Sequence, residues 1–386
     1  MALDRGADDA RAYPELAERD QDGWVKRAFI INSLADGTPS PYTTRGLRLA
    51  LSDRKELNRA FALRGLLRAD DRLLRAVGSQ GLFDALVDTL DSREEFVARA
   101  GGALLARLAG DRERRDKAGW RRWWAEAGET LFVEAARAGP PPPTPAAGGR
   151  DAPASGDELT TRTRALTTHL SQLRERGLEV VFVIDVTSSM ADELARVKGQ
   201  VGEITSFMDL LLPGKTRLGF VTYGYGVVAT CALTNRLERF AQAVEGIALE
   251  QDPRNTTVPE AVEVALEYTL RRDNPLGWRP KAWRTILFLA DAPAQDPVKA
   301  KELAQQAAAA GFVVNALVTQ PPAKYAERWG PGPFFEELTR LGGGTSFELS
   351  TPEELITRLL VMGFGSRHED DLRRFVTAYR EVTARG

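Results

Sequence analysis

The chain has 386 residues, 43% of them hydrophobic and 27% charged, which is enough for more than one hydrophobic core in an ordinary globular protein. The formal net charge is −2 and Lys and Arg are spread among Asp and Glu, so neither nucleic acid nor an anionic membrane is expected as a partner. The single cysteine, Cys231, excludes an internal disulfide, and its apolar neighbours predict a small buried side chain.

The beginning of the chain carries no targeting signal that we recognise. Residues Met1–Asp9 are acidic and lack the apolar core of a secretory signal. No apolar run in the chain approaches the roughly 18 residues needed to span a bilayer. We therefore expect a cytoplasmic protein.

Residues 1–138 are predicted to form an all-helical domain. Apolar side chains recur at three- and four-residue spacing in five segments: Asn58–Leu67, Leu73–Val77, Leu82–Leu90, Glu94–Leu108 and Trp120–Trp124. The spacing of Trp120, Trp123 and Trp124 is typical of core packing on a helix. Phe96–Leu108 followed by Trp120–Trp124 resembles the end of a HEAT- or armadillo-like repeat array, and a four-helix bundle would explain the same pattern.

A linker rich in Pro, Gly and Ala follows at residues 139–157, and it predicts two bodies held apart without a fixed angle. The second domain then occupies residues 158–386, with its core at 178–364. An amphipathic helix over Asp157–Arg176 leads into it, with an apolar stripe that comprises Leu159, Leu166, Leu170 and Leu173.

The most informative segment is the apolar run Val180–Ile184, which ends on Asp185. A continuous apolar run predicts a strand covered on both faces, as in a parallel sheet. Asp185, Thr187 and Ser189 would then lie beyond its carboxyl end, where such sheets bind ligands. These hard oxygens favour Mg²⁺, Mn²⁺ or Ca²⁺. A simple strand-to-helix turn in which Ser189 caps the helix near Ala191–Met208 would explain this motif equally well.

Two later segments favour the ligand site. Asn255–Glu260 places two threonines just before a helix, and Thr285–Ala290 is a second buried-strand pattern that ends on Asp291. Three loops therefore offer oxygen atoms at one edge of one sheet. The predicted fold is α/β, with a doubly wound, mostly parallel sheet and helices on both faces, in addition to the all-α region before it.

Together these motifs resemble the von Willebrand factor type A domain with its metal-ion-dependent adhesion site. The resemblance extends over about Glu179–Phe364 and includes Arg217–Gly224 and Gly311–Leu317 as further strands. It implies five metal ligands: Asp185, Thr187, Ser189, Thr257 and Asp291. The usual Gly-Gly of the second loop is replaced by Arg254-Asn255, so Thr256 is an alternative to Thr257.

The resemblance implies a metal-dependent protein-binding module. Its cation, Mg²⁺ or else Mn²⁺ or Ca²⁺, would engage an Asp or Glu of a partner, and the helical domain would offer a second interaction surface. The alternative is a substrate-recruiting or adaptor subunit of an AAA-type ATPase or chelatase-like machine, and a purely structural role is a third hypothesis.

An enzyme is not expected. His169 and His368 lie in separate helical segments, where we expect them at the surface, and together with Cys231 they offer no Ser-His or Cys-His arrangement.

Overall fold

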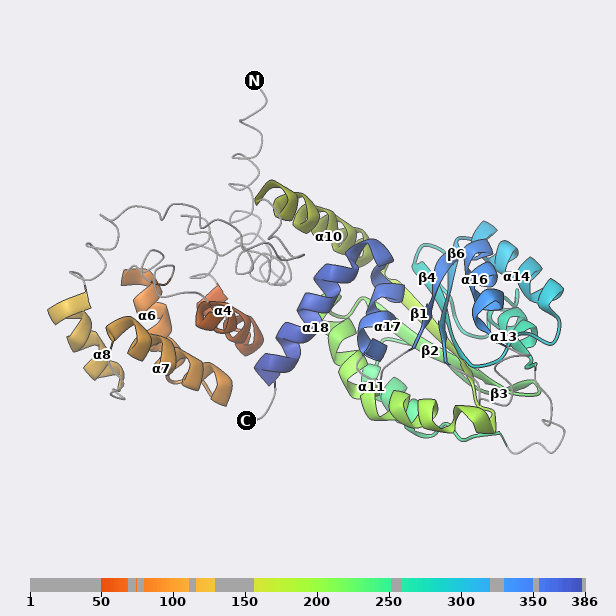
Figure 1. Ribbon diagram of the computed structural model, residues 1–386, viewed down its shortest axis with the longest axis horizontal. Coiled ribbons are helices and arrows are strands. Elements are labelled where there is room, and N and C mark those ends of the chain that lie inside the picture. The colour runs from red at the N-terminus through yellow and green to blue at the C-terminus, as the bar shows by residue number, and fades with distance from the viewer. Residues whose placement is uncertain are drawn as a thin grey trace, which may run out of the picture. The chain divides into compact units, whose positions relative to one another are not determined.

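A computed structural model describes most of the chain (Figure 1). The described residues are 50–68, 74, 80–110, 116–128, 156–250, 259–319, 330–349 and 354–383. They divide into two compact units, which we call the helical unit (Met1–Thr168 with Arg374–Gly386) and the α/β unit (His169–Arg373). Among the helices of these segments, none is both long and apolar enough to cross a bilayer.

The helical unit is built around apolar faces predicted from the sequence. Its described helices are α4 (Glu56–Arg68), α6 (Gln80–Thr89), α7 (Glu95–Ala109), α8 (Lys117–Trp123) and a π-helical turn, η1 (Trp124–Gly128). Trp120 and Trp124 are buried, and the ring of Trp124 stacks on Phe83 with 4.2 Å between centroids. This confirms the prediction that the tryptophans form core. The HEAT-like architecture and the boundaries at 138, 139–157 and 158 remain predictions.

The last residues of the chain also pack within the helical unit. Helix α18 spans Glu369–Thr383, and its part beyond Arg374 lies in this unit. Phe375 of α18 packs on Phe61 of α4 at 5.8 Å between ring centroids. Glu381 forms ion pairs with Arg64 and Arg68, the latter at 2.6 Å. The apolar face of α4 is therefore covered partly by the C-terminal helix.

The α/β unit contains one six-stranded sheet in the order β3-β2-β1-β4-β5-β6. The strands are β1 (Leu178–Asp185), β2 (Thr216–Tyr223), β3 (Val227–Thr234), β4 (Trp283–Ala290), β5 (Phe312–Val318) and β6 (Gly343–Glu348). All neighbours pair in parallel except β3, which runs antiparallel to β2. Every residue of β1 is buried, as expected for the central strand of a sheet covered on both faces. The predicted mostly parallel α/β sheet is confirmed.

Helices cover both faces of this sheet (Figure 1). One face packs against α13 (Val262–Thr269), α14 (Pro297–Ala309) and α16 (Gly332–Leu341). The other carries α11 (Ala191–Leu211), α12 (Leu237–Glu245) and α17 (Glu354–Phe364), and α10 (Gly156–Arg176) precedes β1. Val181 and Val183 point to the first face, whereas Phe182 packs on Phe240 of α12 with centroids 5.7 Å apart. The alternation of side chains along β1 thus supplies both halves of the core.

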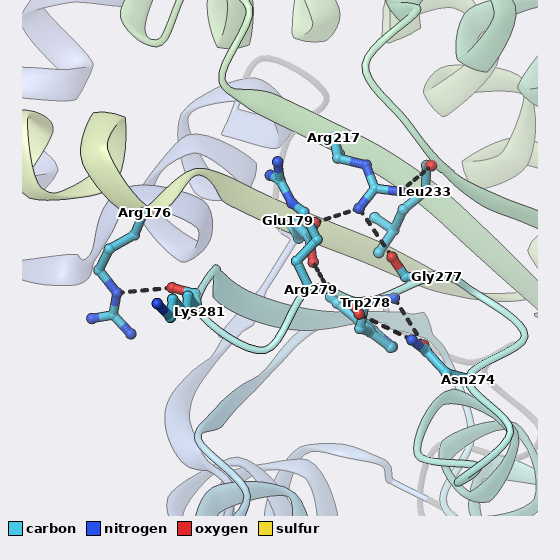
Figure 2. A network of polar contacts seen from close by, with 9 residues as sticks. All are labelled: Arg176, Glu179, Arg217, Leu233, Asn274, Gly277, Trp278, Arg279 and Lys281. Atoms are coloured by element: carbon cyan, nitrogen blue, oxygen red, sulfur yellow. Dashed lines mark hydrogen bonds and ion pairs between the residues drawn. The ribbon is translucent and has the colours of Figure 1, made fainter.

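A polar network ties the amino-terminal edge of the sheet together (Figure 2). Glu179 of β1 is fully buried and accepts hydrogen bonds from Arg217 Nη1 at 2.5 Å and Arg279 Nε at 2.6 Å. The Arg279 amide donates to its second carboxylate oxygen at 2.9 Å. Arg217 also donates to the carbonyls of Gly277 and Leu233, at 3.0 and 2.8 Å. One carboxylate thereby joins β1, β2, β3 and the segment before β4.

Both histidines are buried, and the expectation that they lie at the surface was wrong. Each side chain is only 3% exposed, and the rings of His169 and His368 stack with centroids 5.1 Å apart. Trp283 packs edge-on against His169. Arg367 contacts a nitrogen of each ring, with Nη2 3.0 Å from His169 Nδ1 and Nε donating to His368 Nε2 at 3.0 Å. Two segments far apart in sequence meet here, which no local pattern could indicate.

This histidine pair predicts acid-sensitive stability of the α/β unit. Burial, His169 and Arg367 lower the pKa of His368 to about 4, and burial followed by Arg367 lowers the pKa of His169. Unfolded histidine titrates near pH 6.5, so the unfolded state takes up protons first as the pH falls. We expect the contribution of these histidines to stability to decrease below about pH 6.5 by up to roughly 1.4 kcal/mol per pH unit per histidine, until the folded-state pKa is reached.

The measurement is thermal unfolding of the wild type and His368→Gln between pH 7 and pH 4.5. Glutamine does not titrate and still offers Arg367 an acceptor. The variant should lose less stability than the wild type on acidification. Parallel pH profiles of the two proteins would contradict the assignment.

Candidate metal centre

Asp185 stands at the carboxyl end of β1, where the hydrogen-bonded part of the strand stops. It is fully buried, and its Oδ1 accepts a hydrogen bond from the amide of Thr187 at 2.9 Å. Its Oδ2 accepts no hydrogen bond from any of the described residues. Burying a carboxylate oxygen without a hydrogen-bond donor costs free energy. Asp185 Oδ2 therefore needs a partner that the described residues do not supply.

Two hydroxyls and a second carboxylate lie next to Asp185. Thr187 is 5% exposed, and its Oγ1 lies 3.0 Å from Ser189 Oγ. Ser189 in turn hydrogen-bonds the carboxylate of Asp291, which follows the last residue of β4 and is 3% exposed. β1 and β4 are parallel neighbours, so their carboxyl ends lie side by side. Asp185, Thr187, Ser189 and Asp291 are therefore brought together from two loops.

Glu260 is a member of this group that the sequence analysis did not single out. It is 4% exposed, although Glu is rarely buried, and its Oε2 has no hydrogen-bond partner among the described residues. Its backbone joins the loop after β4: the Glu260 amide donates to Pro293 at 2.9 Å, and Gln295 donates back at 2.8 Å. A Glu directly after Pro at a helix start usually only complements the helix dipole, so this signal was easily overlooked.

The carboxylates raise one another's pKa values. Burial and then Asp291 raise the pKa of Asp185 to about 7, against the lowering effect of the Thr187 hydrogen bonds. Burial, Asp185 and Asp291 raise the pKa of Glu260 to about 8. Burial is also the main cause of the raised pKa of Asp291. The buried hydroxyl of Tyr223 has its pKa raised by burial and by Asp185. The electrostatic potential at this edge of the sheet is thus strongly negative. In the described part of the chain, no Lys or Arg side chain balances these carboxylates.

The threonines predicted for the second loop, Thr257 and its alternative Thr256, lie outside the described residues. Within the described part, no three His, Cys, Asp or Glu side chains lie close enough together to form a metal cluster by themselves. An ion at this edge would therefore depend on the hydroxyls of Thr187 and Ser189 and on water, in addition to Asp185 and Asp291. The oxygen-only donor set and the unpartnered oxygen of Asp185 fit a hard divalent cation.

Part of the chain matches a known domain family. Residues 179–327 match the von Willebrand factor type A domain. No curated protein matches the sequence.

Solved structures similar to this chain include three whose descriptions are informative. The conserved hypothetical protein BatB from Bacteroides thetaiotaomicron is 17% identical, with 48% of this chain and 98% of that chain covered and a TM-score of 0.37. The SpRpn10 VWA domain is 12% identical, with coverages of 49% and 97% and a TM-score of 0.37. Proximal thread matrix protein 1 from the mussel byssus, with a zinc-occupied MIDAS motif, is 15% identical, with coverages of 57% and 52% and a TM-score of 0.37.

Residues 179–327, less than half of the chain, thus resemble the von Willebrand factor type A domain, and domains of this family commonly mediate interactions between proteins.

Proposed function

We propose that the edge of the sheet at Asp185 and Asp291 is a metal-ion-dependent adhesion site, through which the protein binds a partner that presents an Asp or Glu. The observation that carries the proposal is the connected group of hard oxygens at Asp185, Thr187, Ser189 and Asp291, all buried except the exposed Ser189, with one oxygen of Asp185 left unpaired. Thr257, or Thr256 in its place, would add a ligand from the second loop.

A divalent ion would supply the positive charge that these carboxylates lack, and an open coordination position for an anionic side chain. The roles of the protein's own groups follow from their positions. Asp185 and Asp291 would hold the ion from two adjacent strands, directly or through water. Thr187 and Ser189 are neutral, so they would contribute oxygen atoms without cancelling the charge of the ion. Mg²⁺ is the first candidate, and Mn²⁺ and Ca²⁺ have the same preference for oxygen.

Glu260 is expected to strengthen retention of the ion, because its buried carboxylate adds negative charge to the same edge. The hydroxyls of Thr187 and Ser189 lie beside carboxylates that would be occupied by the ion, so we propose a binding role rather than catalysis. An AAA-type ATPase that presents an acidic residue could bind the ion in the same way. The adaptor hypothesis therefore requires the same metal site. The helical unit is the second surface in either case.

The test compares metal binding and partner binding in the same variants of the full chain. Isothermal titration with Mg²⁺ and Mn²⁺ should give binding to the wild type and none to Asp185→Ala. Proteins retained by the immobilised wild type in Mg²⁺ should be released by chelator and should be absent from Asp185→Ala.

The matched control is Asp273→Ala, which removes an exposed carboxylate paired with Arg271. It should bind metal and partner as the wild type does. Equal partner retention by the wild type and Asp185→Ala, with metal and with chelator, would show that this edge is not the recognition surface.

A further inference from the structure

The sheet ends at β3, and this edge is open along the first part of the strand, whereas near its end the Leu233 amide donates to the carbonyl of Leu276 at 2.9 Å. β2 is the only strand that pairs with β3 in the described part of the chain, so the outer side of β3 offers backbone groups that no other strand bonds. Val228, Ala229 and Thr230 are all exposed at the middle of the strand. Val228 is 45% exposed, and Tyr225 in the preceding turn is 46% exposed.

Apart from irregular register near both ends of β3, the edge lacks the charges and prolines that often prevent strands from pairing. Native edges carry Lys, Pro or inward-pointing charges. Tyr223–Asn235 contains none of these, although 27% of the chain is charged. The register with β2 is irregular near both ends of β3, but it is continuous from Ala229 to Cys231. The middle of the strand is therefore regular, uncharged and accessible.

The two ends of β3 carry opposite charges. At the Tyr225 end, the carboxylate of Glu250 accepts a hydrogen bond from the Tyr225 amide at 2.9 Å. At the other end, Arg236 follows the strand and is exposed. An antiparallel copy of the same strand would place the Arg236 end of each molecule beside the Glu250 end of the other. A parallel copy would bring like charges together.

We propose that β3 pairs antiparallel with β3 of a second copy of this chain, which makes the protein a two-fold symmetric dimer. The pairing is self-complementary, because an uncharged strand opposes no like charges and its charged ends complement each other twice by symmetry. Residues directly opposite each other in an antiparallel pair point to the same face of the sheet. In a two-fold symmetric pair, one residue must therefore lie opposite its own copy, with the axis between the two. The centre of Val227–Thr234 lies between Thr230 and Cys231, so one of these two faces its own copy.

The dimer has a consequence for binding. β3 begins at the edge of the sheet where β1 and β4 end, because it runs antiparallel to β2. In an antiparallel pair these edges point in opposite directions. Two six-stranded sheets then form one continuous sheet, with the two candidate metal centres on opposite edges of it. The dimer is bivalent. Because its two metal centres face in opposite directions, it joins two partner molecules and does not hold a single partner at both sites.

The first test is sedimentation velocity of the full chain over a range of concentrations, with and without chelator. The wild type should dimerise in both conditions, which separates this proposal from the proposed metal function. Thr230→Lys places two ammonium groups at the axis and should weaken dimerisation at least tenfold. The control Val298→Lys changes a residue that is 67% exposed on α14 and should leave the dimer intact. A monomer at every concentration would overturn the proposal and leave this edge to a strand of another protein.

The second test locates the interface. Cys231 is half-buried, in contrast to the buried side chain expected from its apolar neighbours, and it is the only cysteine in the chain. In either centred register the two Cys231 Cα atoms lie within about 8 Å. A short bis-maleimide should therefore join the wild type into a covalent dimer and should not join Thr230→Lys. A dimer that neither cross-links through Cys231 nor responds to Thr230→Lys uses another surface, and the proposal fails.

Discussion

Glu179→Ala is expected to destabilise the α/β unit strongly, lowering its free energy of unfolding by roughly 3–5 kcal/mol. Glu179 is fully buried, and it receives three hydrogen bonds from Arg217 and Arg279. Removing it leaves the guanidinium of Arg217, which is 21% exposed, without its counter-ion at the edge of the core. The same change opens a cavity beside β1, so the two effects add.

The measurement is a urea titration with hydrogen–deuterium exchange read on peptides from β1 and β2, which report the stability of this unit. Glu267→Ala is the control, because its carboxylate is 54% exposed and pairs only with Lys299 on the surface. It should cost less than about 1 kcal/mol. Glu179→Gln, which keeps the shape and loses the charge, should fall between the two. If Glu179→Ala is no worse than the control, the buried network does not stabilise the sheet.

The second large effect is expected at Asp185, where loss of the carboxylate should raise the stability of the metal-free protein and abolish metal binding. Without metal, Asp185→Asn should be more stable than the wild type at pH 8. Burial and Asp291 raise the pKa of Asp185 from 3.8 to about 7, so the ionised group costs on the order of 4 kcal/mol in the folded state. The amide keeps the acceptor for the Thr187 amide and carries no charge.

The pH dependence has a definite sign. A carboxyl group whose pKa is raised in the folded state binds its proton more tightly in the folded protein than in the unfolded chain. Relative to Asp185→Asn, the metal-free wild type should therefore lose stability as the pH rises from about 4 to about 7.

Metal should narrow the difference in stability between the two proteins. An ion that binds only the folded state adds about 2.7 kcal/mol at a hundred times its dissociation constant. Thermal unfolding at pH 8 with Mg²⁺ or Mn²⁺ should raise the melting temperature of the wild type and leave Asp185→Asn unchanged. An equal rise in both proteins would place the ion elsewhere on the chain.

Much of the α/β unit could be read from local patterns. The run Val180–Ile184 is apolar at every position because β1 is covered on both faces, and continuous apolar runs of this length have few other uses in a soluble chain. The carboxylates that end β1 and β4 meet because parallel neighbours finish at the same edge. Asp185, Thr187, Ser189 and Asp291 were therefore predictable as a group, while the metal, Thr257 and the HEAT-like repeats remain predictions.

The sequence by itself determined the strands, the sheet class and the order of the oxygen-bearing loops, because each depends on the periodicity or the end of a single segment. Only the tertiary structure decided what depends on segments distant in the chain. It buried Glu260 against the loop after β4, stacked His169 on His368, and left Cys231 half-exposed on an edge strand rather than within the sheet. Burial of a charge or an imidazole is set by the neighbours that fold against it, and a local pattern cannot name those neighbours.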